Sequence, residues 1–520
     1  MGRPIIPPQV SAAEAVSGIP NGAAIALSGF GLTCLAQTLS KALTVRFEKE
    51  GAPRDITAIH AAGHAEGLGV DMLATKKGLL KRIIGGHWGG TPAVREGGAN
   101  EWFEQHNWPQ GVIIGAYRAA AGSEKGLRSP IGLNTYIDPR QIGGCLNESA
   151  RKAGSMIKLE KDCDGEEVLF YAPLRPDYAF LRGWKADRLG NISICWEPLN
   201  IGLEHIAIAT RNNGGHVICQ VREIEDRVFG PEEVHLPGFL VDAIVVTEDH
   251  EIEHRHSPSY AFESKLVQAC MLSEVNAHEM DAVRLWIGRR AAMAVEAGDL
   301  LNLGIGIPGD AVPPALKELG MMDKVIPTLE SGIIGGHGAG LKDFGVAFGP
   351  SARISESTMF DIYHGGSLDI CMMGMAETEA SGNINVSQFA GRNVGCGGFI
   401  DITQSARRIV FCSTFNGRGF AGTFEDGRLR IQSEGKQSKF VPKVQIISFS
   451  AQHALEHHRD VLLITERAVF HLVPGGWELI EIAPGIDLDR EIFAQMSFRP
   501  KVSPQLKTMN PRIFQNILYP

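Results

Sequence analysis

The sequence predicts an α/β protein built from two similar domains, each a mostly parallel sheet covered by helices. The chain has 520 residues, of which 44% are hydrophobic, and this length exceeds what one hydrophobic core usually accommodates. Short apolar runs alternate with stretches of helical periodicity, a pattern typical of parallel sheets. The 61 glycines suit the tight turns that join strands to helices in such folds, and aromatic residues make up only 7%.

A repeat in the sequence supports the division into two halves. The stretches PDYAFLRGWKADRLGNIS, from Pro176, and LDICMMGMAETEASGNINVS, from Leu368, both run from an aspartate through an apolar strand to Gly-Asn-Ile. Upstream of each lie an apolar strand, a G-x-G turn and a helical pattern, in AAIALSGFGLTCLAQTLSKAL from Ala23 and in DLLNLGIGIPGDAVPPALKEL from Asp299. Because the two landmarks recur in the same order, we expect the halves to share one design.

The boundary between the halves is predicted from composition. The segment around EDHEIEHRHSPSY is charged, contains several histidines and is poorly periodic. We therefore predict a first domain over residues 1–225, a linker over 226–285 and a second domain over 286–520. His254 and His256 could suggest a metal site, but the polar surroundings favour a solvated linker.

In the second half the pattern predicts one helix, in RRAAMAVEAG (289–298), followed by strands. The strands are predicted in LLNLG (300–304), KVIPTLE (324–330), LDICMMGM (368–375) and RRIVFCSTF (407–415). The stretch RDVLLITERAVFHLVPGGWELIEIAPG (459–485) predicts strands joined by a Pro-Gly-Gly turn. In open parallel sheets ligands bind at the carboxyl ends of strands, and Glu330 lies at such an end.

Composition excludes several classes of function. The net charge is −9 and no lysine or arginine cluster is present, which argues against nucleic acid as a partner. No window approaches eighteen uninterrupted apolar residues, so we expect no membrane span and a cytoplasmic location. The nine scattered cysteines form no CxxC pair, which favours reduced thiols over a disulfide framework or a zinc site.

Glu330 stands within VIPTLESGIIGGHGAG, where an apolar run ends on one carboxylate and continues into glycines. One interpretation is a dinucleotide site, because GIGIPG (Gly304–Gly309) fits G-x-G-x-x-G and Glu330 could bind a ribose. Against it, Pro308 stiffens the turn and Asp310 would face a pyrophosphate. A second interpretation is a structural glutamate that caps a helix or pairs with a lysine.

A third interpretation makes Glu330 a nucleophile. A desolvated carboxylate that faces an activated acyl group can form a covalent intermediate. The glycines after Glu330 let a large ligand approach the carboxylate. Backbone N–H groups of NVGCGGFIDI (393–402) could supply an oxyanion hole, since the glycines at 395, 397 and 398 allow them to converge.

The whole chain resembles the family I coenzyme A transferases, specifically the single-chain acetate/propionate and 3-oxoacid CoA-transferases. Single motifs are weak, but the ordered set is specific. The motifs are SGFG at Ser28, GGHWG at Gly85, PQGVI at Pro109, DPRQIGGCLN at Asp138, ADRLGNIS at Ala186, VHLPGFLVDAIVV at Val234, GIGIP at Gly304, ESGIIGG at Glu330, FDIYHGGSLD at Phe360, GCGGFI at Gly395 and ERAVF at Glu466.

The resemblance implies an acyl-CoA:carboxylate CoA-transferase that uses Glu330 in a ping-pong mechanism through a glutamyl-CoA thioester. It implies an oxyanion hole from Gln110, Gly397 and Gly398. It implies a site between two Rossmann-like domains, a homodimer or homotetramer, and coenzyme A as substrate, with no metal or redox cofactor. The glycines expected to line the coenzyme A site are Gly29, Gly31, Gly304, Gly306, Gly335 and Gly336.

The sequence departs from the family pattern at several positions near these motifs. His337 and Gly338 stand where a small apolar residue and a proline are usual, and Ile362, His364 and Ser367 alter the common F-D-F-Y-D-G-G-G. Asn134 also replaces an expected glycine. His337 and His364 could meet a polar or acidic acyl group or could be structural histidines. The natural acyl donor and acceptor, the chain length and any preference for dicarboxylates therefore stay open, with acetate, propionate and 3-oxoacids as the expected types. An NAD-dependent oxidoreductase and a non-catalytic acyl-CoA sensor on the same fold remain the alternatives.

Overall fold

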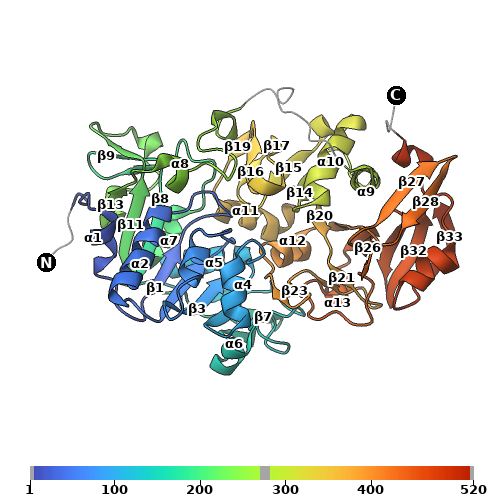
Figure 1. Ribbon diagram of the computed structural model, residues 1–520, viewed down its shortest axis with the longest axis horizontal. Helices are drawn as coiled ribbons and strands as arrows, with labels where there is room; N and C mark the ends of the chain where they lie inside the picture. The colour runs from blue at the N-terminus through green and yellow to red at the C-terminus, as the bar shows by residue number, and fades with distance from the viewer. Residues whose placement is uncertain (1–4, 270–280, 516–520) are drawn as a thin grey trace.

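Two α/β halves lie side by side along the longest axis of the protein (Figure 1). The computed structural model describes residues 5–269 and 281–515. The N-terminal half occupies the left of Figure 1 and the C-terminal half the right. The predicted two-domain α/β fold class is confirmed.

The main sheet of the N-terminal half has seven strands, all parallel, in the order β13-β11-β8-β1-β2-β3-β4. Their residues are mostly buried, as expected of a parallel sheet between helices. The strands are β1 (Ala24–Leu27), β2 (Ile56–His60), β3 (Leu80–Gly85), β4 (Glu104–Asn107), β8 (Tyr178–Arg182), β11 (His216–Val221) and β13 (Ala243–Val246).

Helices flank this sheet. The longest, α2, ends at Gly51, which adopts the left-handed conformation (φ 67°) and donates its N–H to the carbonyl of Phe47. The helices are α1 (Ala12–Ser17), α2 (Gln37–Glu50), α3 (Val70–Ala74), α4 (Pro92–Ala99), α5 (Gln110–Ala121), α6 (Glu148–Ala153), α7 (Leu203–Asn212) and α8 (His250–Glu253).

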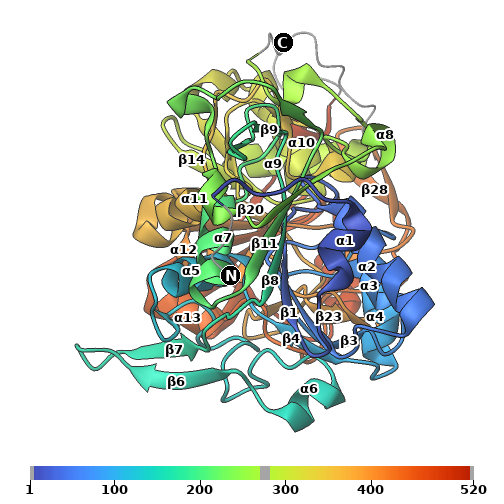
Figure 2. The same cartoon turned by 90° about the vertical axis from the view of Figure 1, so that its left-hand side faces the viewer.

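Two small sheets accompany the main one. An antiparallel sheet of β5 (Leu127–Ser129), β6 (Ile157–Lys161) and β7 (Glu167–Tyr171) projects from the body, as Figure 2 shows. The other contains β9 (Lys185–Asp187), β10 (Ile192–Ser193) and β12 (Glu223–Glu225).

The main sheet of the C-terminal half has ten strands, in the order β19-β16-β15-β14-β20-β25-β30-β31-β32-β33. The run from β15 to β30 is parallel, whereas antiparallel strands extend both edges. The strands are β14 (Leu300–Leu303), β15 (Ile326–Leu329), β16 (Ile333–Ile334), β19 (Ala352–Arg353), β20 (Ile370–Gly374), β25 (Arg408–Cys412), β30 (Asp460–Ile464), β31 (Ala468–Val473), β32 (Gly476–Ile482) and β33 (Lys501–Thr508).

The predicted strands of this half and the Pro-Gly-Gly turn between β31 and β32 are confirmed. The helix predicted at 289–298 is shifted, because Asp281 caps α9 by accepting the N–H of Val283 and the helix ends at Ala292. The helices are α9 (Ala282–Ala292), α10 (Ile307–Glu318), α11 (Glu356–Ile362), α12 (Phe399–Ser405) and α13 (Ala451–Glu456).

Short antiparallel pairs complete the C-terminal half. The pairs are β17 (His337–Gly338) with β18 (Ala347–Phe348), β21 (Glu377–Thr378) with β22 (Ile384–Asn385), β23 (Gln388–Phe389) with β24 (Arg392–Asn393), β26 (Asn416–Gly417) with β29 (Gln437–Ser438), and β27 (Ala421–Glu425) with β28 (Arg428–Ser433).

The aspartates of the sequence repeat make the same contacts in both halves. Asp177 Oδ2 accepts the N–H of Ala24 at 2.8 Å, and the N–H of Asp177 donates to the Ala24 carbonyl at 2.8 Å. Asp369 Oδ2 accepts the N–H of Leu300 at 2.9 Å, and its N–H donates to the Leu300 carbonyl at 3.2 Å. Each aspartate thus fixes the start of a central strand, β1 or β14, against its parallel neighbour.

The described parts of the segment predicted as a linker, residues 226–269 and 281–285, are more ordered than the composition suggests; residues 270–280 lie outside the described residues. Strand β13 lies within residues 226–285 and pairs with β11, so the first sheet extends beyond residue 225. His254 and His256 are buried rather than solvated, because His254 Nε2 lies 3.1 Å from Glu197 Oε1 and both rings pack against Trp184.

The described cysteines are free thiols, most of them buried, with Cys163 exposed; Cys270 lies outside the described residues. In the two described ranges no helix is both long and apolar enough to span a bilayer.

Candidate active site

A cavity of about 500 Å³ lies between the two halves, where the strands of both main sheets end. Phe30, His87 and Gln110 reach it from the N-terminal half, following β1, β3 and β4. Gly304 and Glu330 reach it from the C-terminal half, following β14 and β15. The carboxyl ends of two parallel sheets therefore face one cavity, which is where ligands bind in such folds.

Glu330 presents a buried carboxyl group to this cavity. Its side chain is 7% exposed, and Oε2 makes no hydrogen bond to any described residue. Burial raises the pKa of Glu330 to about 6, and the negative charge of Asp401 adds to the rise, whereas Asn302 opposes it. At neutral pH the carboxylate is thus mostly ionised, poorly solvated and more basic than an exposed glutamate.

Gly332 turns the chain sharply back from Glu330 into β16. Gly332 has a φ of 95°, and a Cβ at this position would lie 2.2 Å from the carbonyl oxygen of Ile354. Only glycine fits this combination of backbone conformation and contact. Gly332 therefore builds the turn that holds the carboxylate at the strand end.

A glycine-rich turn of the C-terminal half is hydrogen-bonded to the N-terminal half beside the cavity. The N–H of Gly397 donates to the carbonyl of Gly86 at 2.8 Å, and the N–H of Gln110 donates to the carbonyl of Gly397 at 2.9 Å. The N–H of Cys396 donates to Asn107 Oδ1 at 3.1 Å. These bonds join the ends of β3 and β4 to the turn that precedes α12.

Gly398 brings this turn against Glu330. It occupies the N-cap position of α12, with φ −82°, and a Cβ placed on it would lie 3.5 Å from Glu330 Cγ. The backbone of Gly398 therefore borders the carboxyl group directly. An N–H group at the start of a helix is a suitable donor to a developing negative charge.

A second buried carboxyl group, Glu356, lies behind Gln110. Gln110 Nε2 donates to Glu356 Oε1 at 2.5 Å, which connects the start of α5 to the start of α11. Burial raises the pKa of Glu356 to about 8, and the charges of Glu330 and Asp401 contribute to the rise. Glu356 is therefore predominantly protonated at neutral pH, so that it can lie near Glu330 without a second charge.

A third buried carboxyl group, Asp401, lies on α12. Its Oδ2 accepts the N–H of Gly111 at 3.2 Å, and its Oδ1 lies 3.1 Å from His364 Nε2. Burial raises the pKa of Asp401, and the hydrogen bond with His364 opposes the rise. This side chain fixes the first turn of α5 against α12.

The histidines at the cavity are neutral. Burial lowers the pKa of His87 to about 4 and holds the pKa of His64 well below its usual value. His60 behind them also has a pKa of about 4 because of burial, and its Nε2 accepts the indole N–H of Trp88 at 3.0 Å. These imidazoles supply polar atoms without positive charge.

The predicted site residues fall into three neighbouring spaces. Six of them line the cavity with one another: Glu330, Gln110, Gly397, Gly398, Gly31 and Gly304. Gly29 instead lines a small space that also contains Glu356. Gly306, Gly335 and Gly336 line a narrow slot, described next.

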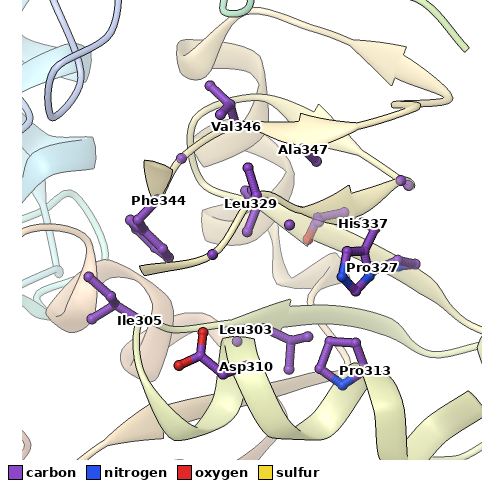
Figure 3. A pocket seen from close by; sticks show the side chains of 18 of the residues that line it. Leu303, Ile305, Asp310, Pro313, Pro327, Leu329, His337, Phe344, Val346 and Ala347 are labelled. Atoms are coloured by element: carbon purple, nitrogen blue, oxygen red, sulfur yellow. The ribbon is translucent and has the colours of Figure 1, made fainter. Parts of the chain in front are cut away.

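The slot, drawn in Figure 3, has a volume of about 50 Å³ and adjoins the cavity at Ile305 and Phe344, which border both spaces. Leu303 and Leu329 line its interior. His337 borders the slot rather than the cavity, and His364 borders neither, since it pairs with Asp401.

Sequence reasoning assigned no role to Glu356 or Asp401. Gln110 and Glu356 are 246 residues apart in the sequence, so no local pattern could pair them. His87 is the histidine of the GGHWG motif at Gly85. This motif could have pointed to His87, although no function was predicted for the residue.

Comparison with known proteins agrees with this geometry. Residues 9–247 match the family model described as coenzyme A transferase. The chain is 37% identical to the acetate CoA-transferase YdiF of Escherichia coli K12, over 98% of this chain and 97% of that protein. It is also 37% identical to the caffeate CoA-transferase of Acetobacterium woodii, over 97% of each. A crystal structure of YdiF from E. coli O157:H7, a thioester complex with CoA, superposes with a TM-score of 0.91 at 36% identity, covering 99% of both chains.

The full-length similarity to CoA-transferases and the shared fold argue against the interpretation of the GIGIPG turn as a dinucleotide site. In the structure, Asp310 at the start of α10 pairs with Arg284, with Oδ2 and Nη2 2.5 Å apart. The chain belongs to the family I coenzyme A transferases, enzymes that transfer coenzyme A between an acyl-CoA and a carboxylic acid.

Proposed function

We propose that Glu330 is the nucleophile of an acyl-CoA:carboxylate CoA-transfer that proceeds by double displacement. The observation that carries this proposal is the buried carboxyl group with an unpartnered Oε2, facing the cavity where both sheets end. A carboxylate oxygen that accepts no hydrogen bond retains its nucleophilicity, and a pKa of about 6 keeps most of the group ionised at neutral pH.

The reaction needs no net proton transfer. A Glu330 oxygen attacks the thioester carbon of the acyl-CoA, the C–S bond breaks, and an acyl-glutamyl anhydride and a coenzyme A thiolate form. The thiolate attacks the glutamyl carbonyl carbon, which releases the first carboxylate and leaves a glutamyl-CoA thioester. An acceptor carboxylate attacks this thioester and expels the thiolate, which then attacks the new acyl carbon. The second acyl-CoA departs and the Glu330 carboxylate is regenerated.

The oxyanion formed in each step requires donors near Glu330. We assign this role first to the N–H of Gly398, whose backbone borders the carboxyl group. The N–H groups of Gln110 and Gly397 are bonded to carbonyls in the structure, so their contribution requires the turn to shift when substrate binds. One such donor is worth roughly 3–4 kcal/mol in the transition state.

The relatives support the transfer of coenzyme A but do not identify the carboxylic acid that this protein uses. The E. coli structure is a thioester complex with CoA, as the proposed intermediate requires. The two relatives at 37% identity are named for different acids, acetate and caffeate. We propose small carboxylic acids of the acetate, propionate or 3-oxoacid type as the starting panel. A cytoplasmic location and a homodimeric or homotetrameric assembly remain predictions.

Steady-state kinetics test the proposal. Initial rates at several fixed acceptor concentrations should give parallel double-reciprocal lines, because the first carboxylate leaves before the second binds. Glu330→Gln should lose at least about 10⁴-fold in kcat while it still binds acyl-CoA. Converging lines together with an active Glu330→Gln variant would contradict the double displacement. Acyl-CoA binding by the wild type without turnover would instead favour the sensor.

A further inference from the structure

We infer that the cavity selects uncharged, apolar acyl groups larger than acetyl and rejects acyl groups that carry a second carboxylate. This inference rests on the proposed function, because it places the acyl group beside Glu330. Three features of the cavity carry it: the apolar walls, the sign of the surrounding charges and the size.

The walls of the cavity are apolar and come from both halves. Phe30 of the N-terminal half and Phe344 of the C-terminal half meet across it, with ring centroids 6.1 Å apart. Met373, Phe389 and Phe399 line the remaining wall. Such a surface gains free energy by covering methylene or aromatic groups.

The charges near the reacting carbon are negative. Glu330 faces the cavity and Asp401 lies behind it, so a second carboxylate on the acyl group would add to the negative charge there. Glu356, behind Gln110, is protonated at neutral pH and adds no charge. His64 and His87 do not compensate, because burial keeps both neutral. A carboxylate placed among these groups would lose its hydration and gain no opposite charge; the unpartnered Nε2 of His64 offers it one neutral hydrogen bond at most.

Lys342 is the one cation among the described residues that line the cavity, and it is exposed to solvent. An exposed lysine contributes little to holding a charge, because water screens it. Beyond Ile305 and Phe344, the slot of Figure 3 offers further apolar surface at Leu303 and Leu329. The slot is also lined by Asp310, whose carboxylate is paired with Arg284.

The cavity must accept the thiol end of coenzyme A as well as the acyl group, and its apolar lining still exceeds what a two-carbon group can cover. The volume of about 500 Å³ extends along both halves, whereas an acetyl group presents a single methyl to the walls. A longer or aromatic acyl group would cover more of the apolar wall. Each methylene that a hydrophobic site accommodates is worth roughly a tenfold change in kcat/KM or more.

A matched pair of donors tests the inference. Pentanoyl-CoA and glutaryl-CoA have the same number of acyl carbons and differ only in a terminal methyl or carboxylate. With one fixed acceptor, we expect kcat/KM for pentanoyl-CoA to exceed that for glutaryl-CoA by at least about 100-fold and that for acetyl-CoA by at least about 10-fold. 3-Phenylpropanoyl-CoA should resemble pentanoyl-CoA. Glutaryl-CoA used as well as pentanoyl-CoA, or acetyl-CoA preferred to both, would overturn the inference.

Variants test the physical cause. Phe389→Arg places a guanidinium in the wall and should raise the glutaryl to pentanoyl ratio of kcat/KM at least about 10-fold, whereas the matched Phe389→Leu should leave this ratio within about 2-fold. Val394→Lys repeats the test at a second position. Lys342→Met should leave the ratio unchanged; a fall would show that Lys342 holds the second carboxylate and would overturn the inference.

The failure of this inference differs from the failure of the proposed function. If glutaryl-CoA is a good donor and Glu330 is still covalently modified during the reaction, the inferred selectivity for apolar acyl groups is wrong, whereas the proposed double displacement holds. If acyl-CoA donors turn over without covalent modification of Glu330, the acyl group does not lie where we place it, and both the selectivity and the proposed function are wrong.

Discussion

The side-chain amide of Gln110 donates a hydrogen bond to the buried carboxyl group of Glu356 and so connects the two halves of the chain beside Glu330. Burial gives the two glutamates different pKa values, about 6 for Glu330 and about 8 for Glu356. Near pH 7 the nucleophile is therefore ionised and its neighbour is neutral. This difference in charge between two nearby carboxyl groups leads to several predictions.

The first prediction concerns the pH dependence of the reaction. We expect kcat/KM to rise with pH through about 6, as Glu330 ionises, and to fall above about 8, as Glu356 acquires a charge that opposes the anionic transition state. In Glu356→Gln the fall above pH 8 should disappear while the rise near pH 6 remains. A pH profile of both proteins checks this, and an unchanged fall in the variant would contradict the role of Glu356.

The second prediction concerns stability. The folded pKa of Glu356, about 8, lies above the value of about 4.3 expected in the unfolded chain, so its contribution to stability is complete below about pH 4.3 and is lost as the pH rises to about 8. Glu356→Gln cannot ionise. The thermal midpoint of the wild type, relative to that of the variant, should therefore fall between about pH 5 and about pH 8.5, by an amount that corresponds to at most roughly 4 kcal/mol. Parallel midpoints over this range would argue against a raised pKa.

The third prediction concerns the electrostatic effect of Asp401 on Glu330. The charge of Asp401 raises the pKa of Glu330, so Asp401→Asn should move the low-pH limb of the kcat/KM profile to lower pH. The amide oxygen that the substitution introduces could still accept the N–H of Gly111, which limits the structural effect. A shift to higher pH, with the thermal midpoint preserved, would show that the charge does not act as proposed.

The fourth prediction concerns the backbone at Gly398. Its φ of −82° suits any residue, but a Cβ would lie 3.5 Å from Glu330 Cγ and 3.2 Å from Ile402 Cδ1. Gly398→Ala should therefore fold and yet lose about 10²-fold in kcat, because the methyl group displaces the reacting groups from the N–H. Gly365→Ala is the matched control, since a Cβ there has no neighbour within 4 Å. Equal activity of the two variants would remove Gly398 from the oxyanion site.

Much of the fold could be predicted because its signals are local. The strand before Glu330, the β31 and β32 hairpin and the aspartates of the repeat all follow from short patterns, and the structure confirms them. Strand β13 was not predicted within the segment assigned as a linker, because a four-residue strand gains its stability from distant β11. The burial of His254 and His256 was likewise not predicted, because the carboxylate beside His254 belongs to Glu197, which is distant in the sequence.

The candidate site likewise contains residues that could be predicted from the sequence and residues that could not. The apolar run and the glycines around Glu330 left three interpretations open, and the resemblance of the ordered motifs to the family singled out Glu330 and the glycines as site residues. The positions of Glu356 and Asp401 could not, because their significance depends on burial and on contacts with Gln110 and Gly111 of the other half. The charge pattern of the cavity therefore becomes visible only when the two halves are assembled.

The measurement that tests the central claim most directly is peptide mass spectrometry after the protein is mixed with an acyl-CoA in the absence of acceptor. Borohydride then reduces any glutamyl thioester to an alcohol that survives digestion. The account predicts a reduced side chain at Glu330 and at no other carboxyl group, and no such product in Glu330→Gln. Consumption of acyl-CoA with an unmodified Glu330 peptide would contradict it.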